Sequence, residues 1–352
     1  MNDFDEYIRQ GEPQKRERGY AWQTAIGLQE VDGLKPSEYL IKTARQHIEG
    51  DITIEEARQL IISYYQSKDN RTTSDDETEE ADKVSVNITK LLNEKTFAFT
   101  IVGFTAIHRR LFEGVFKFAG KIRDYNITKK EWVLRDDTVL YVSATDLRSA
   151  IEHDLEKEKA FDYTNLSMQQ ITSQITKFVS GLWQIHPFGE GNTRTVAVFT
   201  IKYLRSMGFD VENDLFAKHS WYFRNALVRA NYQNIQKGIK RNSEYLECFF
   251  RNLLIGEKNE LKNRHLIIRD NENSQSITSD ISKAQIDTLN YTLEEKVLLD
   301  CFRKNPHIKQ QKVAEHIGKS IATIKRLTAG LIAKGFIVRK NGKRNGFWEV
   351  KI

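Results

Sequence analysis

The strongest constraint on the fold is a short polar loop, residues 186–194, between two segments that have the apolar periodicity of α-helices. Before the loop, apolar residues recur at spacings of three and four: Ile171, Ile175, Phe178, Val179 and Leu182. After it, the pattern resumes with Ala197, Phe199, Ile201 and Leu204, and Gly208 ends it. The loop therefore joins two helices. The second helix presents its N-terminus, where unpaired N–H groups favour an anion.

The residue types in this loop suit chemistry on a phosphate. His186 can accept a proton from a hydroxyl near neutral pH, and Glu190 can hold Mg²⁺ against phosphate oxygens. The Gly191-Asn192 pair can form an anion-binding backbone nest, and Arg194 can pair with phosphate. A histidine at such a helix end is also a common structural residue. Only the whole arrangement, and not the histidine alone, therefore indicates chemistry on a phosphate.

The order His-x-Phe-x-Glu-Gly-Asn-x-Arg resembles the signature of the Fic family, which it matches at His186, Phe188, Glu190, Gly191, Asn192 and Arg194. The resemblance implies a mainly α fold, in which a helical core carries a β-hairpin flap. It also implies that His186 deprotonates a target hydroxyl and that Glu190 holds Mg²⁺. The phosphates would be bound by Gly191, Asn192, Thr193 and Arg194.

A second segment of the same family lies about sixty residues upstream. The family has Ala-Gly-x-x-Arg followed by Asn-Ile-(Ser/Thr)-Lys, and the matching positions are Ala119, Gly120, Arg123, Asn126, Ile127, Thr128 and Lys129. Alternating β-branched residues over 118–142 predict a strand pair here. In Fic proteins this flap pairs with the target polypeptide by strand addition. The resemblance thus implies that residues 126–129 dock the target.

Two positions depart from the family pattern. Thr193 replaces the usual glycine, and we expect its side chain to narrow the phosphate pocket. Ala197 replaces a second arginine, which normally grips the terminal phosphate and pairs with an inhibitory glutamate. The segment Thr24–Glu30 lacks the complete inhibitory pattern. We therefore expect deletion of residues 1–66 to change transfer by less than about tenfold.

The resemblance implies a protein adenylyltransferase that moves AMP from ATP, with Mg²⁺ as cofactor, to a Ser, Thr or Tyr hydroxyl of a target protein. The departures at Thr193 and Ala197 also resemble Doc, a relative that transfers the terminal phosphate as a kinase. A third alternative is a transcriptional regulator whose Fic core senses a nucleotide. The retained His186 argues against that, because nucleotide binding alone needs no base.

Changes in composition divide the chain into five parts: a helical unit (1–66), a polar linker (67–82), the Fic domain (83–260), a second polar linker (261–290) and a C-terminal unit (291–352). The first unit resembles the Vbh-type antitoxin module that accompanies Fic proteins. A plain docking domain would show the same patterning. Trp221, Tyr222 and Phe223 lie where the family places the nucleotide base, although such residues more often pack in a core.

The C-terminal unit carries 14 Lys and Arg against 5 Asp and Glu from Tyr291 onward. Its pattern of three helices and a basic hairpin resembles a winged helix-turn-helix, which implies DNA as a partner. The candidate base readers are Thr323, Lys325 and Arg326, and the candidate phosphate contacts of the wing are Lys340, Lys343 and Arg344. Some winged helices bind protein instead.

Composition also bears on the cellular compartment and the partners of the chain. No apolar run reaches the roughly 18 residues that a membrane span needs, so we expect no membrane partner. The two cysteines, Cys248 and Cys301, cannot make a disulfide framework, which favours a reducing cytoplasm. The sequence leaves the oligomeric state open, and a homodimer is among the alternatives.

Overall fold

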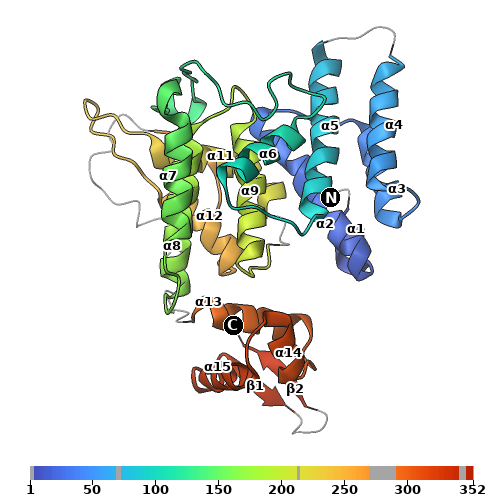
Figure 1. The fold of residues 1–352 in the computed structure, drawn as a ribbon, viewed down its shortest axis with the longest axis vertical. Coiled ribbons are helices and arrows are strands. Elements are labelled where there is room, and N and C mark those ends of the chain that lie inside the picture. Colours follow the sequence, from blue (N-terminus) through green and yellow to red (C-terminus); the bar gives the residue numbers. More distant parts are fainter. Residues whose placement is uncertain (1–3, 69–72, 212–214, 269–290, 341–345, 352) are drawn as a thin grey trace.

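The computed structural model describes residues 4–68, 73–211, 215–268, 291–340 and 346–351. The fold is mainly helical, as the sequence predicted, and the described residues contain one two-stranded antiparallel sheet (Figure 1). None of the described helices is both long enough and apolar enough to cross a membrane.

The N-terminal unit forms the helices that its caps predict. Its elements are α1 (Asp5–Gln10), α2 (Pro13–Gly27), η1 (Leu28–Asp32), α3 (Glu38–Glu49) and α4 (Ile54–Gln66). The Ser37 side chain caps α3, and Thr53 forms a capping box with Glu56 at the start of α4. Gly50 ends α3 with a φ of 92°, a backbone conformation that glycine adopts without strain.

The unit is not separable from the rest of the chain, contrary to the predicted boundary at residue 66. One face of α2 packs with α3 and α4, where the Trp22 indole donates to His47 Nδ1 at 3.0 Å. Its other face places Ala21 and Ala25 in the main core, together with Leu28 at the start of η1. Deletion of residues 1–66 would therefore remove part of that core as well as the unit itself.

The predicted linker over 67–82 is wrong for its second half, because residues 73–82 begin the long helix α5 (Thr73–Asn93). The polar composition of residues 67–82 predicted a solvated linker, yet Asp82 is fully buried. Its carboxylate accepts hydrogen bonds from the Ser37 backbone N–H and from the Tyr65 hydroxyl, both at 2.8 Å. These partners offset the desolvation of the charge and fasten α3 and α4 to α5.

The central part of the chain surrounds helix α9 (Asn192–Ser206), in which every residue from Asn192 to Leu204 is buried. Helices α5, α6, α8 and η1 pack against it (Figure 1). The other elements are α6 (Ile101–Leu111), η2 (Trp132–Leu134), η3 (Ala144–Asp146), α7 (Leu147–Lys159), α8 (Met168–Ile185), α10 (Leu215–Lys218), α11 (Ser220–Asn231), α12 (Glu244–Leu254) and η4 (Asn263–His265). The predicted helices before and after the loop correspond to α8 and α9.

The predicted strand pair over 118–142 is not formed. This segment holds a single isolated bridge, between Glu131 and Asp137, and the short helix η2. The alternation of apolar and polar residues in this segment reflects its anchoring to the core, because Val133, Leu134 and Val139 are buried there. We keep the name flap segment for residues 118–142.

The C-terminal unit has the predicted element order: α13 (Leu293–Lys304), α14 (Gln310–Ile317), α15 (Ile321–Ala333), β1 (Ile337–Lys340) and β2 (Phe347–Val350). The two strands are antiparallel, with Ile337 opposite Val350. The unit contacts the end of α8, where the Met168 N–H donates to the Tyr291 carbonyl at 3.1 Å. Of the predicted second linker, residues 261–268 are packed, with Leu266 and Ile268 buried, and 269–290 lie outside the described residues.

Candidate active site

His186 occupies the C-cap of α8 in a left-handed conformation, with φ 52°. Its Nδ1 lies 3.4 Å from the Trp183 carbonyl oxygen, which can only accept a hydrogen bond. Nδ1 therefore carries the proton, and Nε2 presents a lone pair. No residue in the described part of the chain bonds Nε2. The ring is thus in the tautomer that a general base requires.

The surroundings of His186 keep it neutral. The residue is 4% exposed, and its ring packs against Tyr141 with centroids 4.2 Å apart. Burial lowers its pKa well below the ordinary value, and the charges of Lys129, Arg224 and Arg123 lower it further. The same cations make the space around the ring favourable for a polyanion.

Arg123 holds the histidine in place. Its Nε donates to the His186 carbonyl at 2.9 Å, and its other guanidinium nitrogens donate to the carbonyls of Tyr125 and Val142. Its backbone N–H donates to the Pro187 carbonyl at 2.9 Å. One buried side chain therefore joins both ends of the flap segment to the loop. The Ala-Gly-x-x-Arg match marked this residue but did not reveal the role.

Asn192 and Gly191 fix the shape of the loop. The Asn192 side chain accepts from the Phe188 N–H at 2.9 Å and donates to the Phe188 carbonyl at 2.7 Å. Gly191 has φ 74°, and a Cβ there would lie 2.1 Å from the ring of Phe112, so no other residue fits. The Asn192 side chain closes the loop, which leaves only its backbone N–H for a phosphate.

The Thr193 side chain, which we expect to border the phosphate pocket, is bonded to the neighbouring helix. The Thr193 hydroxyl accepts the indole N–H of Trp183 at 2.9 Å, and both side chains are buried. Trp183 belongs to α8 and Thr193 to the first turn of α9. The hydroxyl therefore fastens the two helices together next to the loop that contains His186.

Glu190, the predicted magnesium ligand, lies at the open side of the loop with its side chain 55% exposed. Its Oε2 is 2.9 Å from Nζ of Lys129, a predicted flap residue, so the structure brings these two candidates together. The described residues contain no group of three or more His, Cys, Asp or Glu side chains that could hold a metal. One carboxylate fits Mg²⁺ only if phosphates supply further ligands, as they do in many nucleotide sites.

Arg194 shows that the N-terminal unit contributes to the site. Its guanidinium is 1% exposed and bonds Gln29 Oε1 at 3.0 Å and Glu80 Oε1 at 2.6 Å, while Nε lies 2.8 Å from Asp32 Oδ2. Its face lies over the ring of Phe112, 4.8 Å from the centroid. The sequence predicted no acidic partner from Thr24–Glu30. The acidic partners, Asp32 and Glu80, come from just beyond that segment and from α5, while Gln29 within it supplies an amide oxygen.

The remaining flap candidates lie apart from these contacts. Asn126 accepts from the Ala144 N–H at 2.9 Å, Ile127 packs partly against the core, and Thr128 is exposed. Of the predicted base-binding aromatics, Tyr222 and Phe223 are core residues. Trp221 is partly exposed and its ring is parallel to that of Trp132, with centroids 6.2 Å apart.

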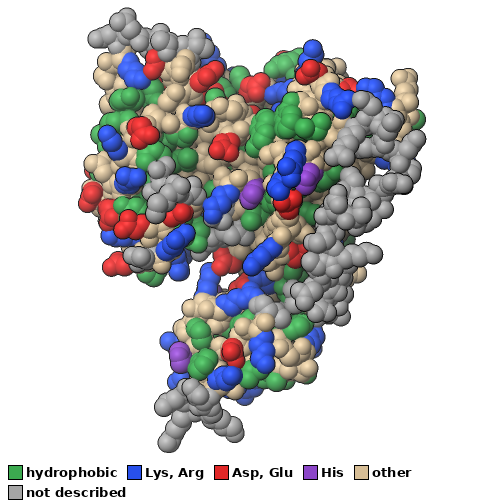
Figure 2. All heavy atoms as spheres, turned by 180° about the vertical axis from the view of Figure 1, so that it is seen from behind, with side chains coloured by type: hydrophobic (Ala, Val, Ile, Leu, Met, Phe, Trp, Pro, Cys, Tyr) green, Lys and Arg blue, Asp and Glu red, His purple; other side chains and the backbone are tan. Residues whose placement is uncertain are grey.

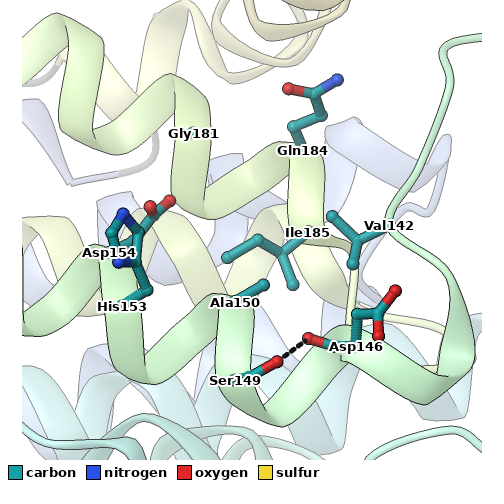
Figure 3. Close-up of a pocket in the computed structure, with 9 residues that line it drawn as sticks. All are labelled: Val142, Asp146, Ser149, Ala150, His153, Asp154, Gly181, Gln184 and Ile185. Atoms are coloured by element: carbon teal, nitrogen blue, oxygen red, sulfur yellow. Dashed lines mark hydrogen bonds between the residues drawn. The ribbon is translucent and has the colours of Figure 1, made fainter.

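A pocket of about 540 Å³ lies between α7 and α8 (Figure 3). Its lining includes Val142, Asp146, Ser149, Ala150, His153, Asp154, Gly181, Gln184 and Ile185. Ile185 directly precedes His186, and Val142 ends the flap segment. Burial raises the pKa of Asp154. The sequence did not single out these positions, because α7 and α8 show only ordinary amphipathic patterns.

The candidate DNA-binding residues lie on the C-terminal unit, where Lys and Arg side chains are visible over the lower lobe in Figure 2. Lys325 and Arg326 are exposed on α15, and the backbone N–H of Thr323 is bonded to the Ser320 cap. Lys340 pairs with Glu349 at 3.2 Å. Lys343 and Arg344 lie outside the described residues.

Comparison with known proteins gives one family match: residues 98–204 fit the model of the Fic/DOC family. No curated protein matches the sequence. Several solved structures match, and two of them are as follows. One is the N-terminal Fic domain of a VirB-translocated Bep effector protein from Bartonella quintana, with 19% identity, TM-score 0.40, and coverage of 53% of this chain and 84% of that one. The other is a Fic family protein from Desulfovibrio desulfuricans G20, with 11% identity, TM-score 0.45, and coverage of 99% and 94%.

The Trp183–Thr193 bond yields a stability prediction. We expect Thr193→Val to lower the free energy of unfolding by about 1–3 kcal/mol, because it leaves a buried indole N–H without an acceptor. Thr200→Val on the same helix is the matched control, since that buried hydroxyl has no partner among the described residues. Urea unfolding measures both variants. Equal losses would show that the hydroxyl of Thr193 has no special role.

Proposed function

Because residues 98–204 form a Fic/DOC domain, we propose that this chain transfers AMP from ATP to a Ser, Thr or Tyr hydroxyl of a target protein. Members of the family transfer nucleotide or phosphate groups to proteins. The observation that carries the proposal is the neutral His186 ring, which has a free Nε2 beside the N-terminus of α9. A base next to an anion site is what transfer to a hydroxyl requires.

In the proposed reaction, His186 Nε2 takes the proton of the target hydroxyl as its oxygen attacks the α-phosphorus of ATP. The bond from that phosphorus to the bridging oxygen of the β-phosphate breaks, and pyrophosphate leaves with the electron pair. The N–H groups of Gly191, Asn192 and Thr193 stabilise the charge that develops on the phosphate oxygens. When Mg²⁺ is bound at Glu190 and the phosphates, it neutralises part of their charge.

The target polypeptide would lie along the flap segment, where Leu140 is 83% exposed and Trp132 is 40% exposed. Because Val142 and Ile185 belong to the pocket between α7 and α8, that pocket can receive a side chain next to the modified hydroxyl. Strand addition would require this segment to become extended when the target binds, because it forms only the Glu131–Asp137 bridge in the structure.

Transfer of the terminal phosphate is the second candidate, and Ala197 is the observation that favours it. This residue is fully buried within α9 and supplies no cation for a terminal phosphate bound beyond the first turn. Two modes of ATP binding, with either the α- or the γ-phosphorus beside His186, then compete. They differ in which phosphate remains on the protein.

Labelled ATP distinguishes the two reactions. With wild-type protein, Mg²⁺ and candidate target proteins, we expect the α-phosphate label to be retained on protein and the γ-phosphate label to be released. His186→Ala should lower transfer by about 10²–10⁴-fold, because it removes the general base. Because the pKa of His186 is lowered, transfer should persist at pH 6.5 and fall only at more acidic pH.

His316→Ala, on the exposed face of α14, is the matched control and should label like wild type. Retention of the γ label would establish the kinase alternative. Full transfer by the His186→Ala protein would contradict the assignment of the base.

The contacts of Arg194 predict regulation by the N-terminal unit. Asp32 and Glu80 compete with phosphate for the same guanidinium. We expect Asp32→Ala to raise labelling at low ATP by about tenfold, because it weakens this competition. Glu30→Ala changes an exposed carboxylate in the same short helix and is the control. If the two variants label equally, Asp32 does not restrain the site.

We also propose that the C-terminal unit binds duplex DNA, with α15 in the major groove. Replacing Lys325 and Arg326 with alanine in the full chain should reduce the slope of log affinity against log salt by about two, because two positive charges that displace counterions from the groove are lost. Replacing Lys157 and Lys159, both exposed on α7, removes the same charge elsewhere. An unchanged slope for the α15 variant would favour a protein-docking role.

A further inference from the structure

His108 is a fully buried histidine on α6 whose two ring nitrogens are both bonded. Its Nδ1 lies 2.8 Å from the backbone nitrogen of Gly120, which can only donate. Nδ1 is therefore an acceptor, so in the neutral ring Nε2 carries the proton. Nε2 lies 3.1 Å from the carbonyl oxygen of Glu190 and donates to it. The ring also stacks on Phe188, with centroids 3.7 Å apart.

The bond from His108 Nε2 to the Glu190 carbonyl fixes the peptide that joins Glu190 to Gly191. The peptide is trans, so its C=O and N–H groups point in opposite directions. With the carbonyl directed at His108, the Gly191 N–H points to the other side of the loop. That N–H has no hydrogen-bond partner within the described part of the chain. It lies at the N-cap of α9, where it extends the row of free donors in the first turn.

The chain itself does not impose this orientation. Gly191 adopts positive and negative φ with nearly equal ease, so rotation of the preceding peptide would meet little local resistance. Phe112 excludes a Cβ at Gly191, so a residue with a more restricted backbone cannot replace the glycine and fix the orientation of the peptide. The external bond from His108 is the contact that selects one orientation of the peptide.

We propose that His108 is a positioning residue that orients the Gly191 N–H toward the phosphate under attack. Through its bond to Gly120, the same ring couples that peptide to the turn that begins the flap segment. An apolar side chain could fill the volume but could supply neither bond. The inference rests on the proposed function, because the value of an oriented N–H comes from the charge that develops during phosphate transfer.

Two amide variants separate the two bonds. The glutamine side-chain nitrogen lies as many bonds from Cα as Nε2 does, so His108→Gln can still donate to the Glu190 carbonyl. The asparagine side-chain oxygen corresponds to Nδ1, so His108→Asn keeps the acceptor for Gly120 and loses the donor. We expect His108→Gln to keep kcat within about threefold of wild type. His108→Asn should lower kcat by about 10–100-fold with a smaller change in KM for ATP.

His47→Asn is the matched control, because it replaces another buried histidine, far from the loop, and keeps the acceptor for the Trp22 indole. It should leave kcat unchanged whatever it does to Tm. Equal kcat for the Gln and Asn variants of His108 would overturn the proposal. A loss in kcat that simply parallels the loss in Tm across the variants would also overturn it.

A binding readout keeps the proposal testable if transfer fails. In amide NMR spectra, inorganic pyrophosphate should shift the Gly191 resonance of wild type and of His108→Gln but not that of His108→Asn. If wild-type protein transfers no label yet shows this pattern, the proposed function fails and the positioning role stands. If all three proteins show the same Gly191 shift, or none does, the positioning role is refuted.

Discussion

The burial of Arg194 is the interaction on which the rest of this structure depends. A guanidinium that is 1% exposed needs anions and acceptors around it, since an unpaired buried charge is strongly destabilising. Asp32 and Gln29 come from the N-terminal unit and Glu80 from α5, so two segments that are distant in the sequence meet at the first turn of α9. These contacts join the acid-rich start of α5 and the N-terminal unit to the helix that carries the loop.

The loop before α9 is held from outside as well as by its own side chains. Arg123 bonds the His186 carbonyl, His108 bonds the Glu190 carbonyl, and Asn192 bonds Phe188 on both sides. Each of these contacts fixes a backbone group near a candidate functional group. A loop fixed in this way needs little reorganisation during a reaction, which is the main source of electrostatic stabilisation in enzymes. The loop would then have the same position in the restrained and the active protein. The two states would differ only in the partners of Arg194.

The sequence predicted what local chemistry decides. The two helices that flank the loop and the order of elements from Leu293 onward follow from short-range periodicity, and the structure has them. It failed where distant contacts decide. The alternation around Val133 and Val139 resembled strands, but those side chains anchor an irregular segment to the core. The partners of Arg194, Asp82 and Thr193 are tertiary contacts, which no pattern within their own segments reveals.

If Arg194 restrains the site, it leaves its carboxylate partners when nucleotide binds to a loop that is already in place. A crystal structure of the full chain with Mg²⁺ and a non-hydrolysable ATP analogue would show this exchange of partners. We expect Arg194 to be bonded to phosphate oxygens and separated from Asp32 and Glu80. The bonds from Arg123 to His186 and from His108 to Glu190 should be unchanged. An analogue bound at α9 while Arg194 still bonds both carboxylates, or with the loop rearranged, would contradict it.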